Sequence, residues 1–417
     1  MKKCKLSEIS TILNGYAFKS TKYVDNGIRI IRIANVQDGE IVDEKPCFYP
    51  YETTDNIDKY KLFEGDLLIS LTGNVGRVGV LPKSMMPAAL NQRVCCLRIN
   101  KEKVNLKYLF YYLRQYNFIQ DCIKASKGVA QLNLSTKWLA EYEILLPELS
   151  EQQRIVERIE ELFSQLDSAV ETLQKTKQQL AVYRQAVLKD AFEGSFTNHN
   201  CFDIELQWSS EEEIKSLPDI PKEWKYVSLS ELGDLGRGKS KHRPRNDPQL
   251  FEDGKYPFLQ TSEVKSAKYT ITEYSKMYGD FGLKQSKLWP KGTLCITIAA
   301  NIAETAFLGI DACFPDSVVG FTPYQYVIPE YIKHFLESQK LRLWAFAPAT
   351  AQKNINLDTL ENLIVPYCSI QEQKEIVAEI EARMSICDSI EKTVDTALQQ
   401  AEAMRQSILK KAFEGKL

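Results

Sequence analysis

The strongest constraint in this sequence is an internal repeat. Residues 151–196 align without gaps on residues 372–417, an offset of 221 positions, and both segments carry Ala-Phe-Glu-Gly close to their ends. Gln131 and Gln352 fall at the same offset, upstream of the two segments. A repeat with this period indicates a duplicated architecture. Because 417 residues exceed what one hydrophobic core usually organises, each half is expected to form a core of its own.

The two repeated segments show the spacing of paired helices. Apolar or small residues recur alternately four and three positions apart, which is the heptad pattern of a coiled coil. Neither segment contains a proline, and about 40 helical residues make a rod of roughly 60 Å. We therefore predict two long helices packed as an antiparallel coiled coil, in preference to two ordinary core helices. The residues predicted to pair the helices are Ile155, Ile159, Leu162, Leu166, Leu173 and Leu180 in the first segment, and Ile376, Ile380, Ile390, Val394, Met404 and Ile408 in the second.

The remaining stretches indicate mixed α and β structure. Short runs rich in β-branched residues predict strands, and one longer amphipathic run in each half predicts a helix. The predicted strands are residues 28–36, 66–73, 94–99 and 293–299, and the predicted helices are residues 106–123 and 331–346. The expected fold class is α+β, with two globular domains of similar fold separated by the two long helices and related by an internal pseudo-twofold repeat.

The repeat also sets the expected boundaries. Between the halves, a run of acidic residues and two prolines is typical of a linker with at most a short helix. The predicted division is residues 1–147 for the first globular domain, 148–196 for the first helical spacer, 197–228 for the linker, 229–368 for the second globular domain and 369–417 for the second helical spacer.

The charge of the chain is small overall but unevenly distributed. The net formal charge is −2, yet residues 1–150 carry 21 basic and 16 acidic side chains, while residues 197–228 carry 3 and 7. A mildly basic first domain permits contact with nucleic acid without demonstrating it, because proteins that never bind DNA often have a similar charge.

Several protein classes have no support in the sequence. No apolar run is long enough for a membrane helix and no signal peptide is evident, so a cytoplasmic protein is expected. The ten cysteines form no Cys-x-x-Cys pair and there are only three histidines, so neither a disulfide framework nor a metal site is expected. Most of the cysteines are expected in the core.

Catalytic motifs are also missing. Residues 233–240 satisfy the nucleotide-binding pattern G-x-x-x-x-G-K-[ST], but Pro244 and Pro248 prevent the helix that must follow a phosphate-binding loop. A methyltransferase acting on amino groups would carry [DN]-P-P-[YF], and the chain has no Pro-Pro dipeptide. No carboxylate cluster of the restriction-endonuclease type stands out. We therefore expect no catalytic residue, cofactor or metal in this chain.

Polar loops remain as the candidate binding elements. Arg and Lys side chains recognise guanine, and Asn and Gln recognise adenine. For any single residue a solvated surface role is the simpler interpretation, and the duplicated arrangement is what favours DNA contact. The candidates are Lys19, Thr72, Asn74, Arg77, Asn91, Gln92, Arg93, Lys127, Gln131 and Asn133 in the first half, and Lys239, Lys241, Arg243, Arg245, Gln260, Thr261, Ser262, Asn301, Lys353, Asn354 and Asn356 in the second.

The same motifs occur in the same order in each half. A glycine-containing opening is followed by a glycine before a strand, a Gln-x-Asn segment, and then Pro, Glu-Gln and Ile-Val. They are Gly15, Gly65-Asp66, Gln131, Asn133, Pro147, Glu151-Gln152 and Ile155-Val156 in the first half, and Gly238, Gly292-Thr293, Gln352, Asn354, Pro366, Glu372-Gln373 and Ile376-Val377 in the second. In these motifs, and over essentially its whole length, the chain resembles the specificity subunits of type I restriction-modification systems.

The resemblance implies a non-catalytic subunit with two target-recognition domains, each reading one part of a bipartite, asymmetric site in double-stranded DNA. It implies that the paired helices set the unread spacer. It further implies two modification subunits, which bind S-adenosylmethionine and methylate adenine, and restriction subunits that use ATP and Mg²⁺. The second half departs from the first at Ala300 and Ala303, which stand where the first half has Gly73 and Gly76, so its loop geometry is less closely predicted.

Other readings remain open at this point. A coiled-coil adaptor would bind partner proteins and use its polar loops only as solvated surface. A specificity subunit of a modification-only system would have the same architecture without a cleavage partner. A methyltransferase or fused restriction enzyme would bind S-adenosylmethionine unaided, and the missing motifs argue against it.

Overall fold

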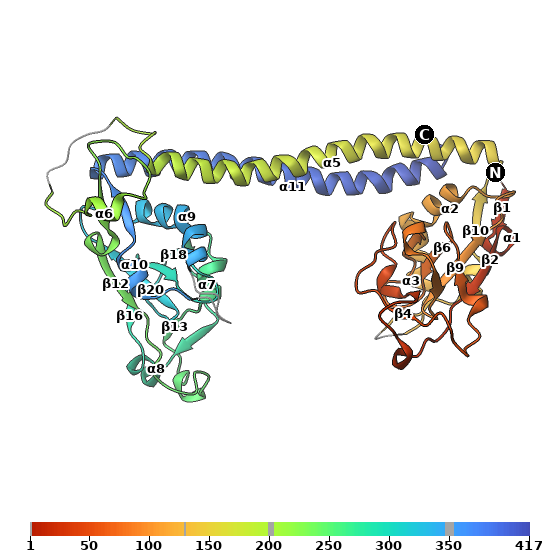
Figure 1. Cartoon of the computed structure of the whole chain (residues 1–417), viewed down its shortest axis with the longest axis horizontal. Coiled ribbons are helices and arrows are strands. Elements are labelled where there is room, and N and C mark those ends of the chain that lie inside the picture. The colour runs from red at the N-terminus through yellow and green to blue at the C-terminus, as the bar shows by residue number, and fades with distance from the viewer. Residues whose placement is uncertain (1, 129–130, 199–203, 347–353) are drawn as a thin grey trace. The chain divides into compact units, whose positions relative to one another are not determined.

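The chain forms two compact units (Figure 1). The computed structural model describes residues 2–128, 131–198, 204–346 and 354–417. Unit 1 comprises Met1–Gln174 and Val394–Leu417, and unit 2 comprises Lys175–Thr393. Each long helix contributes one part to each unit, so the predicted helical spacers are divided between the units.

The described residues of unit 1 form three sheets. The first is antiparallel, in the order β2 (Ser10–Asn14), β9 (Val94–Ile99), β6 (Leu67–Ser70) and β7 (Val78–Val80). The second has the order β4 (Phe48–Tyr49), β3 (Ile28–Ile31), β8 (Ala88–Leu90) and β5 (Lys61–Leu62), with β3 and β8 parallel. The third pairs β1 (Lys2–Lys5) with β10 (Glu143–Leu146). The short helices are α1 (Leu6–Ile9), α2 (Leu106–Leu113), α3 (Tyr116–Ala125) and α4 (Thr136–Glu141).

The central strands of unit 1 are apolar along their length because both faces of their sheet are covered. Leu67 and Ile69 of β6 lie in the core shared with the helices. Leu68 of β6 and Cys96 of β9 lie in the core on the other face. Such two-sided burial explains why the sequence shows no alternation of polar and apolar residues there.

Unit 2 repeats this plan. Its antiparallel sheet has the order β12 (Gly233–Arg237), β20 (Val318–Pro323), β17 (Leu294–Thr297) and β18 (Thr305–Leu308), to which β14 (Thr270–Ile271) adds in parallel. Its second sheet has the order β15 (Lys276–Tyr278), β13 (Tyr256–Phe258), β19 (Ala312–Cys313) and β16 (Leu288–Trp289), and β11 (Lys225–Ser228) pairs with β21 (Ile364–Tyr367). The helices are α6 (Glu211–Ile214), α7 (Thr261–Ser266), α8 (Asp280–Lys284), α9 (Pro329–Phe346) and α10 (Leu357–Glu361). The repeat therefore extends through the stretches whose sequences have diverged.

One predicted helix is divided. Residues 106–123 form α2 and α3 instead of a single helix, and the break falls at Arg114 and Gln115. Gln115 is extended, and its side-chain amide donates to the carbonyl of Tyr112 at 3.1 Å. This bond satisfies a carbonyl at the end of α2 and competes with continuation of the helix. The counterpart in unit 2, α9, is a single helix.

The repeated segments form two helices of 44 residues, α5 (Leu149–Phe192) and α11 (Ile370–Phe413). In unit 2, Lys177 of α5 lies opposite Glu391 of α11 and Arg184 lies opposite Asp388, so the partners run in opposite directions. In unit 1, Asp167 of α5 likewise forms an ion pair with α11. The helices are antiparallel in each unit, as the fold prediction states (Figure 1).

The contact row between the helices differs in part from the prediction. Ile390 and Met404, predicted to pair the helices, are 40% and 52% exposed, and Leu162 and Leu173 are half-buried. In a regular coiled coil both alternating rows of apolar residues pack against the partner helix, so the exposure of these residues departs from that geometry. The buried row, with members seven or fourteen residues apart, is Ile159, Leu166, Leu180 and Val187 in α5, and Ile380, Cys387, Val394, Ala401 and Ile408 in α11.

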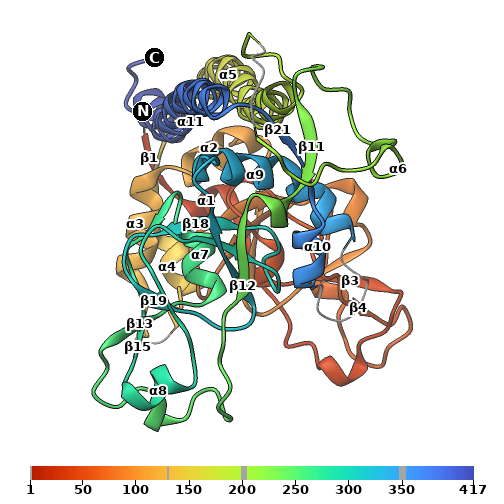
Figure 2. The ribbon, with the colours of Figure 1, turned by 90° about the vertical axis from the view of Figure 1, so that its left-hand side faces the viewer.

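The linker packs against the core of unit 2 through Ile204, Leu206, Trp208 and Ile220. Ser209 N donates to Tyr226 O at 2.9 Å, so the chain around Trp208 runs beside β11 (Figure 2). Trp224 is 3% exposed, and its Nε1 donates to Glu372 at 3.1 Å. Residues 225–228, which the sequence division assigns to the linker, form β11.

A buried glutamine joins each long helix to its globular domain. Gln152 accepts a hydrogen bond from Asn105 N at 2.8 Å, and its amide donates to the carbonyls of Pro147 at 2.9 Å and Lys103 at 3.1 Å. Gln373 makes the same three bonds in unit 2, at 2.8, 3.0 and 3.2 Å. Both side chains are fully buried. The Glu-Gln motif therefore holds the start of the helix to two preceding segments.

Candidate nucleic-acid interface

The predicted loops of unit 1 form one continuous surface. They are the hairpin loop (residues 71–77), the β8–β9 loop (residues 91–93) and the Gln-x-Asn loop (residues 126–128 and 131–134). Leu71 N donates to Arg93 O at 3.0 Å, and Leu134 N donates to Leu71 O at 2.8 Å. Thr72 and Asn133 face each other across a β-bridge. The hairpin loop thus lies between the other two.

Most candidate side chains on this surface are available to a partner. Asn91 is half-buried and accepts from Arg93 N at 3.2 Å, and Arg77 donates to Gln37 Oε1 at 2.7 Å. The hydroxyl of Thr72 is buried and has no hydrogen-bond partner among the described residues. The exposed candidates are Lys19, Asn74, Gln92, Arg93, Lys127, Gln131 and Asn133.

The hairpin loop keeps its backbone conformation in both units. Gly73 and Gly76 have φ of 67° and 80°, and their counterparts Ala300 and Ala303 have φ of 63° and 59°. Thr297 Oγ1 accepts from Glu304 N at 3.0 Å, as Ser70 Oγ accepts from Arg77 N at 3.0 Å. The loss of two glycines has therefore not changed the loop, and the two alanines occupy the left-handed region at a cost.

Relief of this strain gives a stability prediction. Ala300→Gly is expected to raise the free energy of unfolding by about 0.5–1 kcal/mol, because glycine adopts positive φ without a steric penalty. Ala300 is exposed, so no core contact is lost. Urea unfolding measures the change. Ala299→Gly, one residue earlier, is the control and should be neutral or destabilising.

The candidate loops of unit 2 come together in the same way. Ala299 and Asn354 form a β-bridge, and Asn301 Oδ1 accepts from Lys265 Nζ at 3.2 Å. Asn354 is exposed, whereas Asn356 Oδ1 accepts from Thr359 N at 2.8 Å and caps α10. Asn356 therefore has a structural role that its position in a polar loop does not reveal. Lys353 lies outside the described residues.

Gln260, Thr261 and Ser262 lie at the start of α7. Ser262 Oγ donates to Glu263 at 2.7 Å. Burial would raise the pKa of Glu263, but hydrogen bonds from Ser262, Ser275 and backbone groups lower it. The hydroxyl of Ser262 is therefore already bonded to a carboxylate of its own unit, and Glu263 gives this part of the candidate surface a negative charge.

In the basic segment of unit 2 (residues 239–245), both arginines form hydrogen bonds within their own unit. Arg245 donates twice to Asp316, at 2.8 and 3.0 Å, and Arg243 donates to the carbonyls of Ser240 and His242. A hydrogen bond to His242 lowers the pKa of Asp247. Lys239 and Lys241 are exposed. Residues 233–237 form β12, so the nucleotide-binding pattern is a strand paired with β20 and not a phosphate-binding loop.

Two residues that contact candidate DNA-binding side chains were not predicted from the sequence. Gln37 orients Arg77, and Lys265 contacts Asn301. Both contacts join residues 36 or more positions apart, so no local pattern indicates them. No group of His, Cys, Asp and Glu in the described ranges is arranged to hold a metal ion, and no helix there is long and apolar enough to cross a bilayer.

The two units share one scaffold and differ in the side chains of their polar loops. This is the organisation of a protein with two recognition domains. Residues 1–181 and 221–400 match the family model described as the type I restriction modification DNA specificity domain. The chain belongs to this family. It is 28% identical over 99% of its length to the Escherichia coli type I restriction enzyme EcoBI specificity subunit, of which the match covers 85%. It is 24% identical over 99% of its length to the EcoKI specificity subunit of E. coli K12, with 88% of that protein covered.

Solved structures show the same fold. A chain from a structural study of assembly and conformational transition in the type I R-M system matches with a TM-score of 0.75 and 20% identity, covering 100% of this chain and 98% of the other. The HsdS subunit from Thermoanaerobacter tengcongensis matches with a TM-score of 0.57 and 19% identity, covering 100% and 97%.

Proposed function

We propose that this chain selects the DNA sequence on which a type I restriction-modification complex acts, each unit reading one part of a bipartite, asymmetric site. One observation carries the proposal. The two units keep the same sheet order and hairpin-loop backbone but present different side chains on them. Arg77 is replaced by Glu304, and the β8–β9 loop Asn91-Gln92-Arg93 is replaced by Pro315-Asp316-Ser317 between β19 and β20. One scaffold with two sets of polar side chains suits two unlike half-sites.

The side chains proposed to contact DNA are the exposed ones of the joined loops. In unit 1 they are Asn74, Gln92, Arg93, Lys127, Gln131 and Asn133. Lys19, which follows the Gly15 motif in the sequence, is also exposed and is included in the proposal. In unit 2 they are the exposed Asn354, Lys239 and Lys241, together with Asn301, which is half-buried. Arg243, Arg245 and Asn356 are less suited, because their side chains already bond within the unit.

We further propose that methyltransferase subunits dock on this chain and that restriction subunits join through them. The names of the relatives as type I restriction enzyme specificity subunits support this assembly. S-adenosylmethionine would then be held by the modification subunits, and ATP with Mg²⁺ by the restriction subunits. Equilibrium dialysis tests which subunit binds S-adenosylmethionine. We expect the complex to retain it and this chain alone not to. Retention by the chain alone would assign the methyltransferase site to it.

DNA affinity is expected to fall steeply with salt. A complex that neutralises six or more phosphates loses about a thousandfold or more in affinity between 50 and 200 mM salt. Fluorescence anisotropy of a labelled duplex, with this chain and its modification subunits, measures the slope. The coiled-coil adaptor alternative predicts no DNA binding and a protein contact that changes little with salt. A modification-only system would methylate DNA in the same way but show no cleavage partner.

A further inference from the structure

A short turn that follows β3 in unit 1 has a counterpart after β13 in unit 2. We call the two segments cap turns, and they are residues 32–37 and residues 260–265. Val36 and Val264, at an offset of 228 positions, are both 1% exposed. The residue before each valine, Asn35 or Glu263, accepts a hydrogen bond from the first backbone N–H of its own turn, at 2.9 and 3.1 Å. The two cap turns are therefore equivalent in structure.

The side chain that follows the valine contacts the hairpin loop in both units. In unit 1, Gln37 Oε1 accepts from Arg77 Nη1 at 2.7 Å. In unit 2, Lys265 occupies the same position, and its Nζ donates to Asn301 Oδ1 at 3.2 Å. The chemistry differs, because a hydrogen-bond acceptor in one unit is replaced by a cation in the other. The same position of the scaffold nevertheless holds a candidate base-reading side chain in each unit.

Gln37 is itself fixed by two further hydrogen bonds. Its backbone N–H donates to Glu40 O at 3.0 Å, and its Nε2 donates to Ala34 O at 2.9 Å. The second bond determines which way the amide faces, so the oxygen is the atom presented to Arg77. Immobilising a free arginine on DNA costs side-chain entropy, and a bond already made to Gln37 reduces that cost.

One edge of the Arg77 guanidinium remains free. Nη1 is the atom bonded to Gln37, whereas Nε and Nη2 have no hydrogen-bond partner among the described residues. The backbone of Arg77 is fixed as well, because its N–H donates to Ser70 Oγ at 3.0 Å. Nε and Nη2 lie along one side of the planar group and donate in parallel, which is the arrangement that O6 and N7 of guanine accept.

Unit 2 presents a different donor. The counterpart of Arg77 is Glu304, whose carboxylate pairs with Lys340 at 2.7 Å. The side chain held by the cap turn is Asn301, and with its Oδ1 bonded to Lys265 the Nδ2 group is left to donate to a base. The two units therefore offer a paired donor edge and a single amide donor, respectively.

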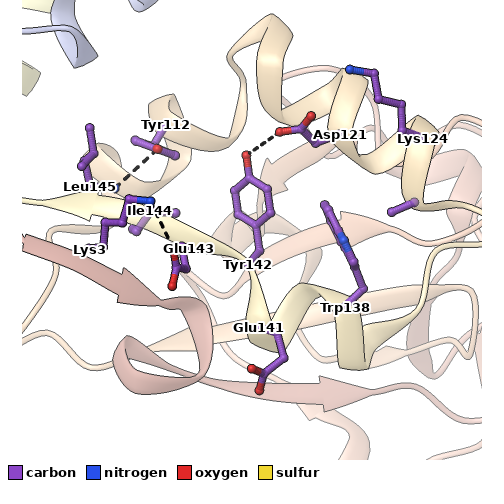
Figure 3. Close-up of a pocket in the computed structure, with 11 residues that line it drawn as sticks. Lys3, Tyr112, Asp121, Lys124, Trp138, Glu141, Tyr142, Glu143, Ile144 and Leu145 are labelled. Carbon is purple, nitrogen blue, oxygen red and sulfur yellow. Dashed lines mark hydrogen bonds and ion pairs between the residues drawn. The ribbon is translucent and has the colours of Figure 1, made fainter.

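A cavity in unit 1 contains none of these residues. It measures about 820 Å³ and is lined by Lys3, Trp138 and Tyr142 among others, with the Tyr142 hydroxyl donating to Asp121 at 3.1 Å (Figure 3). None of its described lining residues belongs to the candidate loops or to the cap turn. Readout in unit 1 is therefore argued from side chains fixed on the loop surface and not from a base inserted into that cavity.

We propose that the residue after the cap-turn valine is a positioning residue for DNA readout. Gln37 holds Arg77 so that it donates to a guanine in the half-site of unit 1. Lys265 holds Asn301 so that its amide donates to a base acceptor in the half-site of unit 2. This inference rests on the proposed function of the chain. It adds the half-buried Arg77 to the base-reading side chains and gives residues outside the candidate loops a share in sequence preference.

A double-mutant cycle in the complex with the modification subunits tests the pair in unit 1. The chains are wild type, Gln37→Ala, Arg77→Ala and the double variant. The measurement is the methylation rate of the recognised duplex and of duplexes with one base pair changed at a time. Arg77→Ala should lower the preference for one G·C pair in the half-site of unit 1 by about tenfold or more, and Gln37→Ala by about fivefold. The double variant should lose no more than Arg77→Ala, because Gln37 acts through Arg77.

Gln37→Glu separates positioning from a purely structural role. A glutamate keeps an oxygen that accepts from Arg77, so it should restore most of the preference for the G·C pair, while its added charge lowers affinity equally for all sequences. Lys265→Ala should lower sequence preference in the other half-site only. Each half-site thus serves as the internal control for the other.

The wild-type complex distinguishes failure of this inference from failure of the proposed function. If wild type prefers its own site, the inference is overturned by wild-type preference in Gln37→Ala or Lys265→Ala, by additive losses in the double variant, or by equal losses in both half-sites. The proposed function then still stands. A wild-type complex that methylates all the duplexes at one rate would contradict the proposed function, and this inference with it.

Discussion

Gln373→Ala is expected to lower the free energy of unfolding by about 3 kcal/mol. The substitution leaves the N–H of Ile328 and the carbonyl of Cys368 without the bonds from the fully buried Gln373, while the carbonyl of Tyr326 keeps only its bond from the Tyr367 hydroxyl at 3.3 Å. Each unsatisfied buried group costs about 1–3 kcal/mol, partly offset where water enters. Four of the five tryptophans belong to unit 2, so urea unfolding followed by tryptophan fluorescence reports mainly on that unit.

Gln371→Ala is the matched control, because Gln371 is exposed on the same helix and bonds to Glu375 at its surface. Its effect should stay within about 0.5 kcal/mol. If Gln373→Ala has an equally small effect, the buried glutamine does not hold the helix to its domain. Gln152→Ala should destabilise unit 1 for the same reason, since its three bonds are the same.

Arg93→Ala is expected to weaken recognition by about tenfold to a hundredfold, and only for the half-site read by unit 1. Arg93 is exposed, and its backbone is fixed against Leu71 of the hairpin loop. A base-reading arginine contributes about 1–3 kcal/mol of discrimination. The measurement is the methylation rate, in the assembled complex, of sites altered in one half at a time.

Lys101→Ala provides the control for charge. Lys101 is also exposed, but it follows the far end of β9, whereas Arg93 precedes its start. Loss of a cation there should change affinity slightly and equally for all sequences. Equal effects of the two substitutions would mean that Arg93 acts only through its charge.

Much of the architecture follows from local pattern. The repeated segments predict the starts of α5 and α11 to within two residues and their ends to within four, and the repeat predicts a second unit of the same plan. The joining of the hairpin loop to the Gln-x-Asn loop also occurs in both units, as the duplicated motifs suggest. These features depend on short-range periodicity or on the repeat itself, and both are visible in one sequence.

Other features depend on contacts that periodicity does not encode. The break before Gln115 comes from a side-chain bond to a carbonyl, and Asn356 caps a helix although it resembles a base-reading residue. Ile390 is exposed although the heptad spacing places it on a predicted contact row. The docking of Trp224 on Glu372 joins residues 148 positions apart. The composition of the linker predicts a loop but not the surface on which it packs.

The most direct test of the central claim is to map methylated adenines across the genome of a methylation-free host that expresses this chain with its modification subunit. Single-molecule sequencing should reveal a split motif with a fixed unread gap, and exchange of residues 1–147 for the corresponding domain of another family member should change one half of the motif and leave the other intact. A complex that assembles without methylating DNA, or an exchange that alters both halves, would contradict the account.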